Sequence, residues 1–393
     1  MKLRLIVIIL ITSFYSFSQH QIGRTTITFN DPARTGGFGS GGGPGRQIQT
    51  EIYYPAVSAG NDVALAAGEF PIIVFGHGFA MSWDAYQNIW EHYVPMGYIM
   101  AFPRTEGGLI PPPSHQDFGL DLKIVTEKLS LLDAEAASLF FDKLNGNVAI
   151  MGHSMGGGAS ILASANNISI KTVVGLAPAE TDPSAIASAA NVTVPALIFS
   201  GGQDGVTPAA DHHTPIYNAL DSDCKTFVNI VGGAHCYFAN SNTACDFGEG
   251  TSSTGISITR TEQQDRTYSI LDHWLEYRLK DNSASYDLFL TAINASPATL
   301  VSTTTCSAGT NPDPLSITEQ DDLKNKLTIY PNPTTGLFQI ENMYATTSLV
   351  RIYSTSGKLV LEQEYTNQID ISKLNNGIYY MKIDNSTTKI VKY

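Results

Sequence analysis

The 393-residue chain is poor in charge, and in basic residues above all. It has 23 Lys and Arg against 36 Asp and Glu, a net charge of −13, and only 15% charged residues. Nucleic acids and anionic membranes bind basic surfaces, so this balance argues against both as partners. The 43% of apolar residues is sufficient for a packed core, and the length allows two domains.

Long hydrophobic runs are absent after the N-terminus. The chain begins with basic Lys2 and Arg4, an apolar run over residues 5–11, and small residues just before Gln19. This pattern predicts a secretory signal peptide over residues 1–18, because the run is shorter than the ~20 residues of a membrane span. We expect an exported protein with no integral membrane span.

Cysteines are few: Cys224, Cys236, Cys245 and Cys306. Export permits disulfides, and four cysteines allow three pairings. Cys236 and Cys245 both follow the predicted strand over residues 226–231, whereas Cys224 precedes that strand and Cys306 follows the last helix. We therefore expect the disulfides Cys236–Cys245 and Cys224–Cys306.

Two structural patterns divide the chain. Strands alternate with helices over residues 19–301, which predicts an α/β domain with a mostly parallel sheet flanked by helices. A Thr-, Gly- and Pro-rich stretch over residues 302–326 predicts a linker. Short alternating runs over residues 327–393 predict a small all-β sandwich. That last part has no His or Cys, so the chemistry is expected in the first domain.

A glycine-rich stretch over residues 36–45 contains a formal match to a dinucleotide-binding fingerprint. No buried strand leads into it, no helix follows it, and Pro44 interrupts it. We interpret the stretch as a hairpin loop and expect no cofactor.

Residues 152–156 form a G-x-S-x-G motif centred on Ser154. Such a motif alone is weak, but here it follows a predicted strand over residues 147–151 and precedes a predicted small-residue helix. The glycines leave room for a serine on a strained, tight turn. We predict that Ser154 is a nucleophile.

A serine hydroxyl needs a neighbouring base, and in this arrangement an acid and a histidine follow later strands. Asp204 lies just after the predicted strand over residues 194–199, and His235 just after the strand over residues 226–231. Both fall at the carboxyl end of the sheet, so we predict a Ser154–His235–Asp204 triad. Asp211 is an alternative acid, further from its strand.

Two other features near these loops have alternative interpretations. The adjacent His212 and His213 resemble a metal pair, but neighbouring loop residues rarely share a metal, so no metal site is expected. An oxyanion needs two backbone N–H donors, which we assign to Met155 and to Phe79 in the loop after an early buried strand. The alternative for that loop is a simple tight turn.

Together these motifs resemble the α/β-hydrolase superfamily and, more narrowly, its polyesterase–lipase–cutinase group, over most of residues 48–279. The matching segments are Gly78-Phe79, residues 152–158, Ala177-Pro178, residues 194–199, residues 204–208 and residues 233–235. The resemblance implies an α/β-hydrolase fold, a cofactor-free serine ester hydrolase, and substrate-binding roles for Phe79, Met155 and Val206.

One segment departs from that group. Its members place a Trp about four residues after the Ala-Pro pair, and residues 179–182 contain none. The resemblance therefore implies slow turnover of aromatic polyesters.

Only residues 177–193 separate the predicted strand over residues 172–176 from the one over residues 194–199. This stretch is too short for a cap domain and therefore predicts an open cleft. Tyr237, Phe238 and Trp83 are candidates for its apolar walls, with core packing as the alternative for Trp83.

The last ~70 residues resemble a type IX secretion sorting domain. The matching residues are Tyr330-Pro331-Asn332-Pro333, Gly336, Gly377-Ile378-Tyr379 and the terminus over residues 389–393. The resemblance implies that the type IX machinery is a partner and that the protein is extracellular or on the cell surface. The alternative is a carbohydrate-binding or adhesive module.

The sequence as a whole predicts a secreted serine ester hydrolase. The resemblance implies that it is promiscuous and also cleaves polyesters such as poly(ethylene terephthalate), PET, slowly. The first alternative is a carboxylesterase or lipase that acts only on short- to medium-chain soluble esters. The second is an inactive hydrolase that serves as a surface binding protein, against which the intact order of Ser154, Asp204 and His235 argues.

Overall fold

The computed structural model describes residues 20–295, 298–306, 328–341, 349–354, 358–383 and 386–393. The chain divides into two compact units, residues 1–311 and 312–393, each of which is described by itself. The predicted signal peptide lies outside the described residues. Within the described part, no helix combines the length and the apolar character needed to cross a bilayer.

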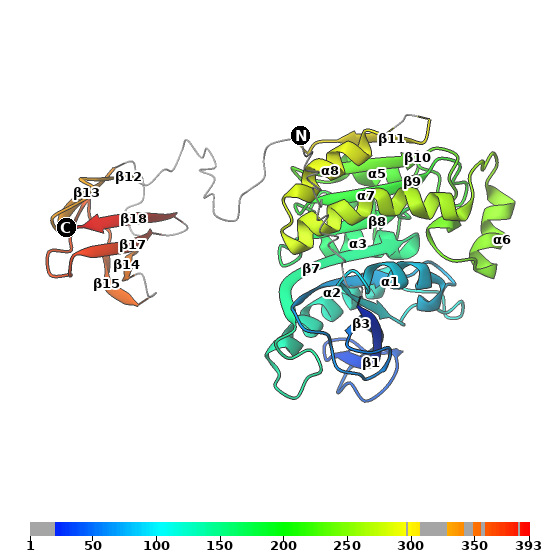
Figure 1. The fold of residues 1–393 in the computed structure, drawn as a ribbon, viewed down its shortest axis with the longest axis horizontal. Helices are drawn as coiled ribbons and strands as arrows, with labels where there is room; N and C mark the ends of the chain where they lie inside the picture. Colours follow the sequence, from blue (N-terminus) through cyan, green and yellow to red (C-terminus); the bar gives the residue numbers. More distant parts are fainter. Residues whose placement is uncertain (1–19, 296–297, 307–327, 342–348, 355–357, 384–385) are drawn as a thin grey trace, which may run out of the picture. The chain divides into compact units, whose positions relative to one another are not determined.

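The N-terminal unit is built on an 11-stranded sheet of order β11-β10-β9-β8-β7-β5-β6-β3-β1-β4, with β2 paired to β3 (Figure 1). The strands from β5 to β10 pair in parallel. Antiparallel pairs are formed by β1 with β3, by β3 with β6 and by β10 with β11. The strands are β1 (Gln21–Asp31), β2 (Gly37–Phe38), β3 (Arg46–Ala56), β4 (Gly60–Asn61), β5 (Phe70–Gly76), β6 (Ile99–Pro103), β7 (Leu144–His153), β8 (Thr172–Leu176), β9 (Ala196–Gly201), β10 (Lys225–Ile230) and β11 (Leu300–Thr304).

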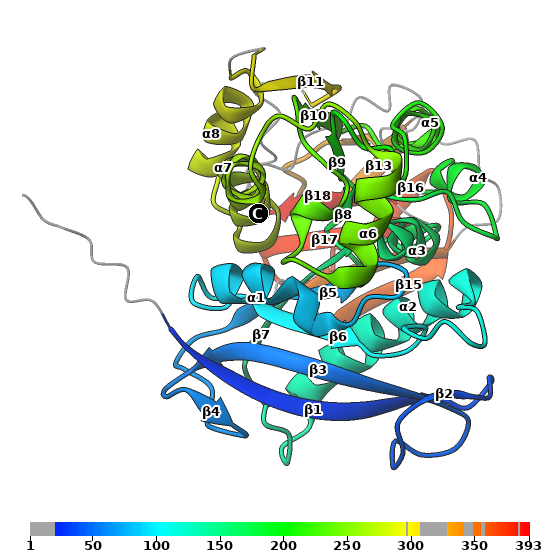
Figure 2. The ribbon, with the colours of Figure 1, turned by 90° about the vertical axis from the view of Figure 1, so that its right-hand side faces the viewer.

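Helices cover both faces of this sheet. The α-helices are α1 (Gln87–Tyr93), α2 (His115–Leu131), α3 (Met155–Ser164), α4 (Ala185–Ala189), α5 (His213–Ala219), α6 (Thr243–Ser252), α7 (Arg260–Lys280) and α8 (Ala284–Ile293). The short 3₁₀ helices are η1 (Trp83–Tyr86), η2 (Leu132–Ala134) and η3 (Cys236–Phe238). Helices α1, α7 and α8 lie on one face and α2 to α5 on the other, each layer enclosing its own apolar core (Figure 2).

The local sequence explains this arrangement. Every residue of β5 is buried, as expected for a central parallel strand that is covered on both faces. Helix α7 begins with a capping box in which Thr259 and Glu262 satisfy each other's backbone N–H groups, and it buries Trp274 against the sheet. The expected α/β fold with a mostly parallel sheet is therefore confirmed.

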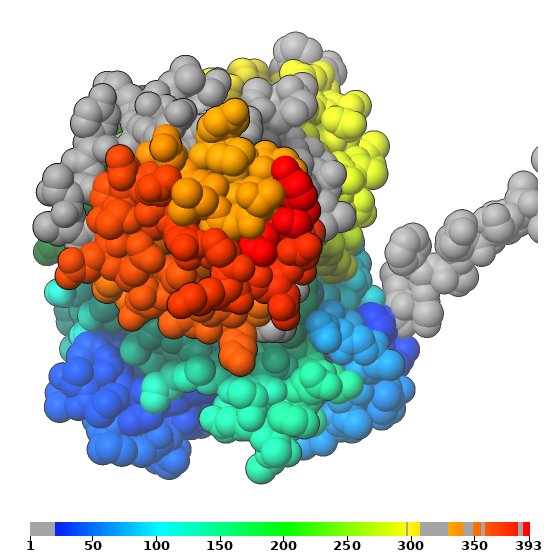
Figure 3. All heavy atoms as spheres, turned by 90° about the vertical axis from the view of Figure 1, so that its left-hand side faces the viewer, coloured from blue at the N-terminus to red at the C-terminus, as the bar shows by residue number. Residues whose placement is uncertain are grey.

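The C-terminal unit consists of two antiparallel sheets that share one apolar core, as the alternating runs predict. The three-stranded sheet has the order β12-β13-β16 and the four-stranded sheet the order β15-β14-β17-β18. Their strands are β12 (Thr328–Tyr330), β13 (Leu337–Glu341), β14 (Leu349–Ser354), β15 (Leu359–Glu364), β16 (Gln368–Asp370), β17 (Gly377–Ile383) and β18 (Ser386–Lys392). Figure 3 shows the atoms of this unit, in orange to red, as a closely packed surface.

The junction after the first unit differs from the sequence interpretation. The predicted linker starts at residue 302, but β11 continues to Thr304 and pairs with β10. Cys306 is then bonded to Cys224, just before β10. Residues 302–306 therefore belong to the edge of the sheet and not to a linker. The sequence does not distinguish the two, because a threonine-rich segment suits an exposed edge strand as well as a linker.

The structure contains the disulfides Cys224–Cys306 and Cys236–Cys245, which is the pairing that the strand order predicts. The first bond closes a loop with a sequence separation of 82 and ties β11 to β10, whereas the second closes a separation of only 9 after β10. The two bonds thus restrict the unfolded chain to different degrees.

Replacing each cysteine pair by alanine should separate these contributions. Loop-closure entropy predicts a loss of about 4.5 kcal/mol in the free energy of unfolding for Cys224→Ala/Cys306→Ala, and about 2.7 kcal/mol for Cys236→Ala/Cys245→Ala. Urea unfolding of both variants and the parent measures the difference. A larger loss for the short loop would contradict the entropic account.

Candidate active site

Ser154 occupies a sharp turn between β7 and α3. Its backbone angles are φ 55° and ψ −121°, a conformation that is strained for a residue with a side chain. The turn is fixed by its neighbours, since Ser154 N–H donates to Leu176 O at 3.0 Å and Ala179 N–H donates to Ser154 O at 2.9 Å. The strained turn presents the serine at the carboxyl end of the sheet, as the G-x-S-x-G context predicts.

Glycines make this turn possible. A Cβ atom at Gly156 would lie 2.1 Å from the carbonyl oxygen of Gly76, and one at Gly152 would lie 2.2 Å from that of Gly156. Both distances are far below any tolerable contact, so the start of α3 packs directly on the backbone of β5 and β7. The two glycines of the motif therefore stand at positions where the structure has no space for a side chain.

Asp204 lies in the loop after β9 and its carboxylate is surrounded by donors. Oδ1 accepts hydrogen bonds from the backbone N–H groups of Val206 (2.9 Å) and Thr207 (2.8 Å). Oδ2 lies 2.7 Å from Nδ1 of His235 and 3.1 Å from Oγ1 of Thr207. The side chain is fully buried, and these partners satisfy the acceptor sites of an ionised carboxylate.

Two opposing effects act on the pKa of Asp204. Burial raises it, because a carboxylate loses solvation in the interior. The hydrogen bond from His235, the positive charge of a protonated His235 and the hydrogen bond from Thr207 N–H outweigh burial, so the pKa of Asp204 is lowered from its usual value. The acid therefore stays ionised beside the histidine.

Several side chains hold the His235 loop from behind. The Gln263 amide donates to Ala234 O and accepts from Ala234 N–H, each at 2.8 Å, and Glu249 accepts from Cys236 N–H at 2.6 Å. Together with the Cys236–Cys245 bond, they fix the backbone on both sides of His235, whose side chain is 2% exposed.

A buried chain of hydrogen bonds links the three loops of the site. Gly78 N–H donates to the hydroxyl of Tyr86 at 2.7 Å, and this hydroxyl lies 2.9 Å from Nδ1 of His153. Nε2 of His153 lies 3.0 Å from the carbonyl oxygen of His235 and must donate to it. Burial lowers the pKa of His153 well below its usual value, so its neutral ring accepts the Tyr86 hydroxyl proton at Nδ1.

The structure brings some of the predicted residues together more closely than others. His235 Nδ1 faces Asp204, and the His235 and His153 rings are 4.8 Å apart between centroids, which places the base beside the residue that precedes Ser154. Within the part of the chain that the structure describes, however, Ser154 Oγ forms no hydrogen bond. The Asp204–His235 pair is therefore assembled, and its catalytic link to Ser154 remains a prediction.

The predicted substrate-contacting residues differ in exposure. Phe79 is 51% exposed and Met155 is 3% exposed, whereas Val206 is half-buried. Phe79 thus offers an accessible aromatic face, whereas Met155 packs in the core below α2 to α5, and its contact with substrate remains a prediction. The roles of their backbone amides toward an oxyanion remain predictions.

The three candidate apolar walls differ in burial. Phe238 is 3% exposed and belongs to the core, so its assignment as a cleft wall is wrong. Its position in the short helix η3 turns it inward. The rings of Trp83 and Tyr237 are half-buried and lie under the guanidinium groups of Arg104 (4.2 Å) and Arg260 (4.6 Å), which favours packing over substrate contact.

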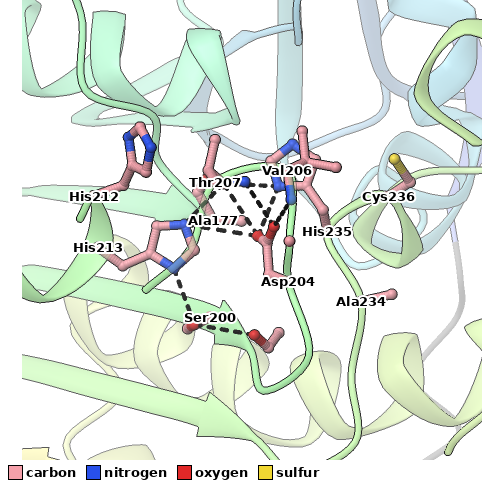
Figure 4. Close-up of polar contacts among 12 residues, drawn as sticks. Ala177, Ser200, Asp204, Val206, Thr207, His212, His213, Ala234, His235 and Cys236 are labelled. Atoms are coloured by element: carbon pink, nitrogen blue, oxygen red, sulfur yellow. Dashed lines mark hydrogen bonds and ion pairs between the residues drawn. The ribbon is translucent and has the colours of Figure 1, made fainter. Parts of the chain in front are cut away.

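Sequence reasoning missed two residues of this site. Thr207 Oγ1 contacts both Asp204 and His235, and His213 is completely buried with its Nε2 3.8 Å from Asp204 Oδ2 (Figure 4). His213 begins α5, a helix that the sequence pattern did not reveal. The described residues contain no cluster of three or more His, Cys, Asp or Glu suited to a metal, and His212 instead accepts a hydrogen bond from Glu180 N–H.

Comparisons with known proteins agree with this geometry. Residues 19–271 match the family model described as PET hydrolase-like, and residues 328–393 match a secretion system C-terminal sorting domain, which indicates secretion. The chain is 22% identical over 222 residues to cutinase est1 of Thermobifida alba, covering 56% of this chain and 66% of that protein. It is 25% identical over 255 residues to a bis(hydroxyethyl) terephthalate hydrolase of Streptomyces coelicolor, covering 65% and 66%.

A third relative has a higher sequence identity over a shorter alignment. Cutinase 1 of Thermobifida cellulosilytica is 34% identical over 89 residues, covering 22% of this chain and 32% of that protein. The chain spans just under two thirds of the length of the first two relatives. Because the family model covers well over half of the chain and coincides with the unit that holds the Ser154 elbow and the Asp204–His235 pair, the chain belongs to the PET hydrolase-like family.

Proposed function

We propose that this protein is a secreted serine ester hydrolase that acts on carboxylic esters and slowly hydrolyses polyesters such as PET. The observation that carries the proposal is the buried Asp204–His235 hydrogen bond of 2.7 Å, on loops that follow β9 and β10 at the same edge of the sheet as the strained Ser154 elbow after β7. An imidazole held by a carboxylate at Nδ1 presents Nε2 as a base. The named relatives, cutinases and a terephthalate ester hydrolase, support the same class of reaction.

The proposed reaction proceeds through an acyl-enzyme. Ser154 Oγ attacks the ester carbon and transfers its proton to Nε2 of His235, while Asp204 holds the imidazole in position and stabilises its positive charge. His235 then protonates the leaving alkoxide. Water attacks the acyl-enzyme with His235 again as the base, which releases the acid. The amides of Phe79 and Met155 would donate to the oxyanion in both steps.

The surroundings of the site bear on the substrate. Between β8 and β9 the described chain holds only the five-residue helix α4, so no cap domain is inserted there. An open site with an exposed Phe79 suits bulky or surface-bound esters. Residues 179–182 contain no aromatic side chain that could clamp an aromatic ring, which is why turnover of an aromatic polyester should be slow. A carboxylesterase or lipase restricted to soluble esters is the second candidate.

The route of export is part of the proposal. A signal peptide over residues 1–18 would direct the chain out of the cytoplasm, and the type IX machinery would recognise the C-terminal unit.

Replacing the nucleophile tests the reaction class. Ser154→Ala should lower kcat for a p-nitrophenyl ester by roughly 10⁶-fold, because the covalent step is lost. Ser188→Ala, in the short helix α4, is the matched control and should retain full activity. Activity of Ser154→Ala within tenfold of the parent would exclude the proposed mechanism.

Two asparagine variants distinguish the alternative acids. Asp204→Asn should lower kcat by about 10⁴-fold. An amide neither holds the neutral imidazole in the tautomer that is protonated at Nδ1 nor stabilises the positive charge of the protonated ring. Asp211→Asn should have little effect, because Asp211 is exposed and outside the His235 contacts. Steady-state kinetics on the same soluble ester measures both. The reverse order of effects would transfer the role to Asp211.

Product release from amorphous PET film, compared with hydrolysis of soluble short- and medium-chain esters at equal enzyme concentration, tests the substrate range. We expect turnover of all three, with the film slowest because no second aromatic clamps the ring. Film cleavage by a known cutinase is the positive control. If that control releases terephthalate while this protein hydrolyses only the soluble esters, the restricted esterase is favoured.

A further inference from the structure

His213 is a buried histidine that the proposed reaction does not use. It is completely buried at the start of α5. Its Nδ1 lies 2.9 Å from Oγ of Ser200 at the end of β9, and its Nε2 lies 3.0 Å from Oγ1 of Thr207. Figure 4 shows the His213 ring directed at the Asp204 loop, whereas the neighbouring His212 points away from it.

The His213 ring is neutral. Burial lowers its pKa to about 3, since the positive form loses its solvation, so one ring nitrogen carries a proton at neutral pH and the other accepts one. Which nitrogen is protonated depends on the hydroxyl groups on either side.

The hydroxyl of Thr207 has more polar neighbours than protons. Its Oγ1 lies 2.8 Å from Nδ1 of His235, 3.1 Å from Oδ2 of Asp204 and 3.0 Å from Nε2 of His213. If this hydroxyl donated to His213, an oxygen lone pair would face the Asp204 carboxylate at 3.1 Å without a proton between them. If it donates to Asp204, Nε2 of His213 must be the protonated nitrogen.

The second arrangement satisfies every group. The Ser200 hydroxyl donates to Nδ1 of His213, Nε2–H of His213 donates to Thr207 Oγ1, and the Thr207 hydroxyl donates to Oδ2 of Asp204. Asp204 then receives four donors, two on each oxygen, the fourth being His235. The Ala177 carbonyl oxygen is another acceptor near the Thr207 hydroxyl, but at 3.5 Å it lies further from Oγ1 than Oδ2 of Asp204 does at 3.1 Å.

We propose that His213 is a positioning residue that orients the Thr207 hydroxyl toward Asp204 and so fixes the carboxylate for His235. The inference rests on the proposed function, because it concerns the same acid–base pair. A carboxylate held on both oxygens cannot rotate its Oδ2 away from the imidazole. His213 acts only through Thr207, without contact to the ester.

Two variants of His213 test this role in the full-length protein. His213→Leu removes the donor, so the Thr207 hydroxyl can turn away from the charged Asp204 carboxylate. The loss of that second hydrogen bond should lower kcat about 10- to 100-fold, with KM changed less than about twofold. His213→Gln keeps an N–H at the position of Nε2 and should restore most of kcat. His273→Leu, in α7, is the matched control, and circular dichroism confirms folding. Equal loss in His213→Leu and His213→Gln would overturn the proposal.

The Thr207 hydroxyl provides an independent test if His213→Leu does not fold. Thr207→Val removes the hydroxyl while keeping a branched side chain and should lower kcat as much as His213→Leu does, whereas Thr207→Ser should stay near the parent. In a double-mutant cycle, His213→Gln and His213→Leu should differ little in the Thr207→Val background. Full activity of Thr207→Val would exclude the proposed positioning of Asp204 by His213 through the Thr207 hydroxyl.

These outcomes are separable from the proposed function itself. If Ser154→Ala is inactive while His213→Leu and Thr207→Val match the parent, the serine mechanism stands and the positioning role fails. If Ser154→Ala remains active, the proposed function fails whatever His213 does.

Discussion

The close approach of α3 to the ends of β5 and β7 determines the geometry of the whole site. At Gly76, Gly152 and Gly156 the backbones lie so near one another that a Cβ on any of the three would fall within 3.0 Å of a neighbouring main-chain atom. This contact holds Ser154 in its strained conformation and brings the loop after β5 beside the elbow. The strain is sustained because β7 and α3 are buried on both sides.

Buried polar groups then hold the remaining loops in register with the elbow. The path from Gly78 through Tyr86 and His153 to the His235 carbonyl crosses three loops far apart in sequence, and each donor on it has an acceptor. Unsatisfied polar groups in such an interior would be costly, so the loops favour one mutual arrangement. The neutral rings of His153 and His213 suit this structural use, since neither needs to titrate near neutral pH.

The sequence predicts the parts of this site that depend on local pattern. Ser154, Asp204 and His235 could be located because each follows a recognisable strand, and parallel strands end at one edge. Thr207 and His213 could not, because their roles depend on how the loop after β9 folds back onto Asp204, which no periodicity encodes. Phe238 was misassigned for the same reason: an aromatic residue in an irregular segment gives no sign of which way it faces.

Rigidity and exposure are distributed unequally across the site. The His235 loop is held by Gln263, Glu249 and a disulfide, and Asp204 by four donors, whereas Phe79 is half exposed to solvent. A proton-transfer pair benefits from a fixed geometry, because its contribution falls steeply with misplacement. Selectivity for the acyl group instead depends on walls that surround it, and of the three residues predicted to contact substrate only Phe79 is exposed. A rigid Asp204–His235 pair beside an exposed Phe79 is therefore the combination on which the proposed ester hydrolysis depends.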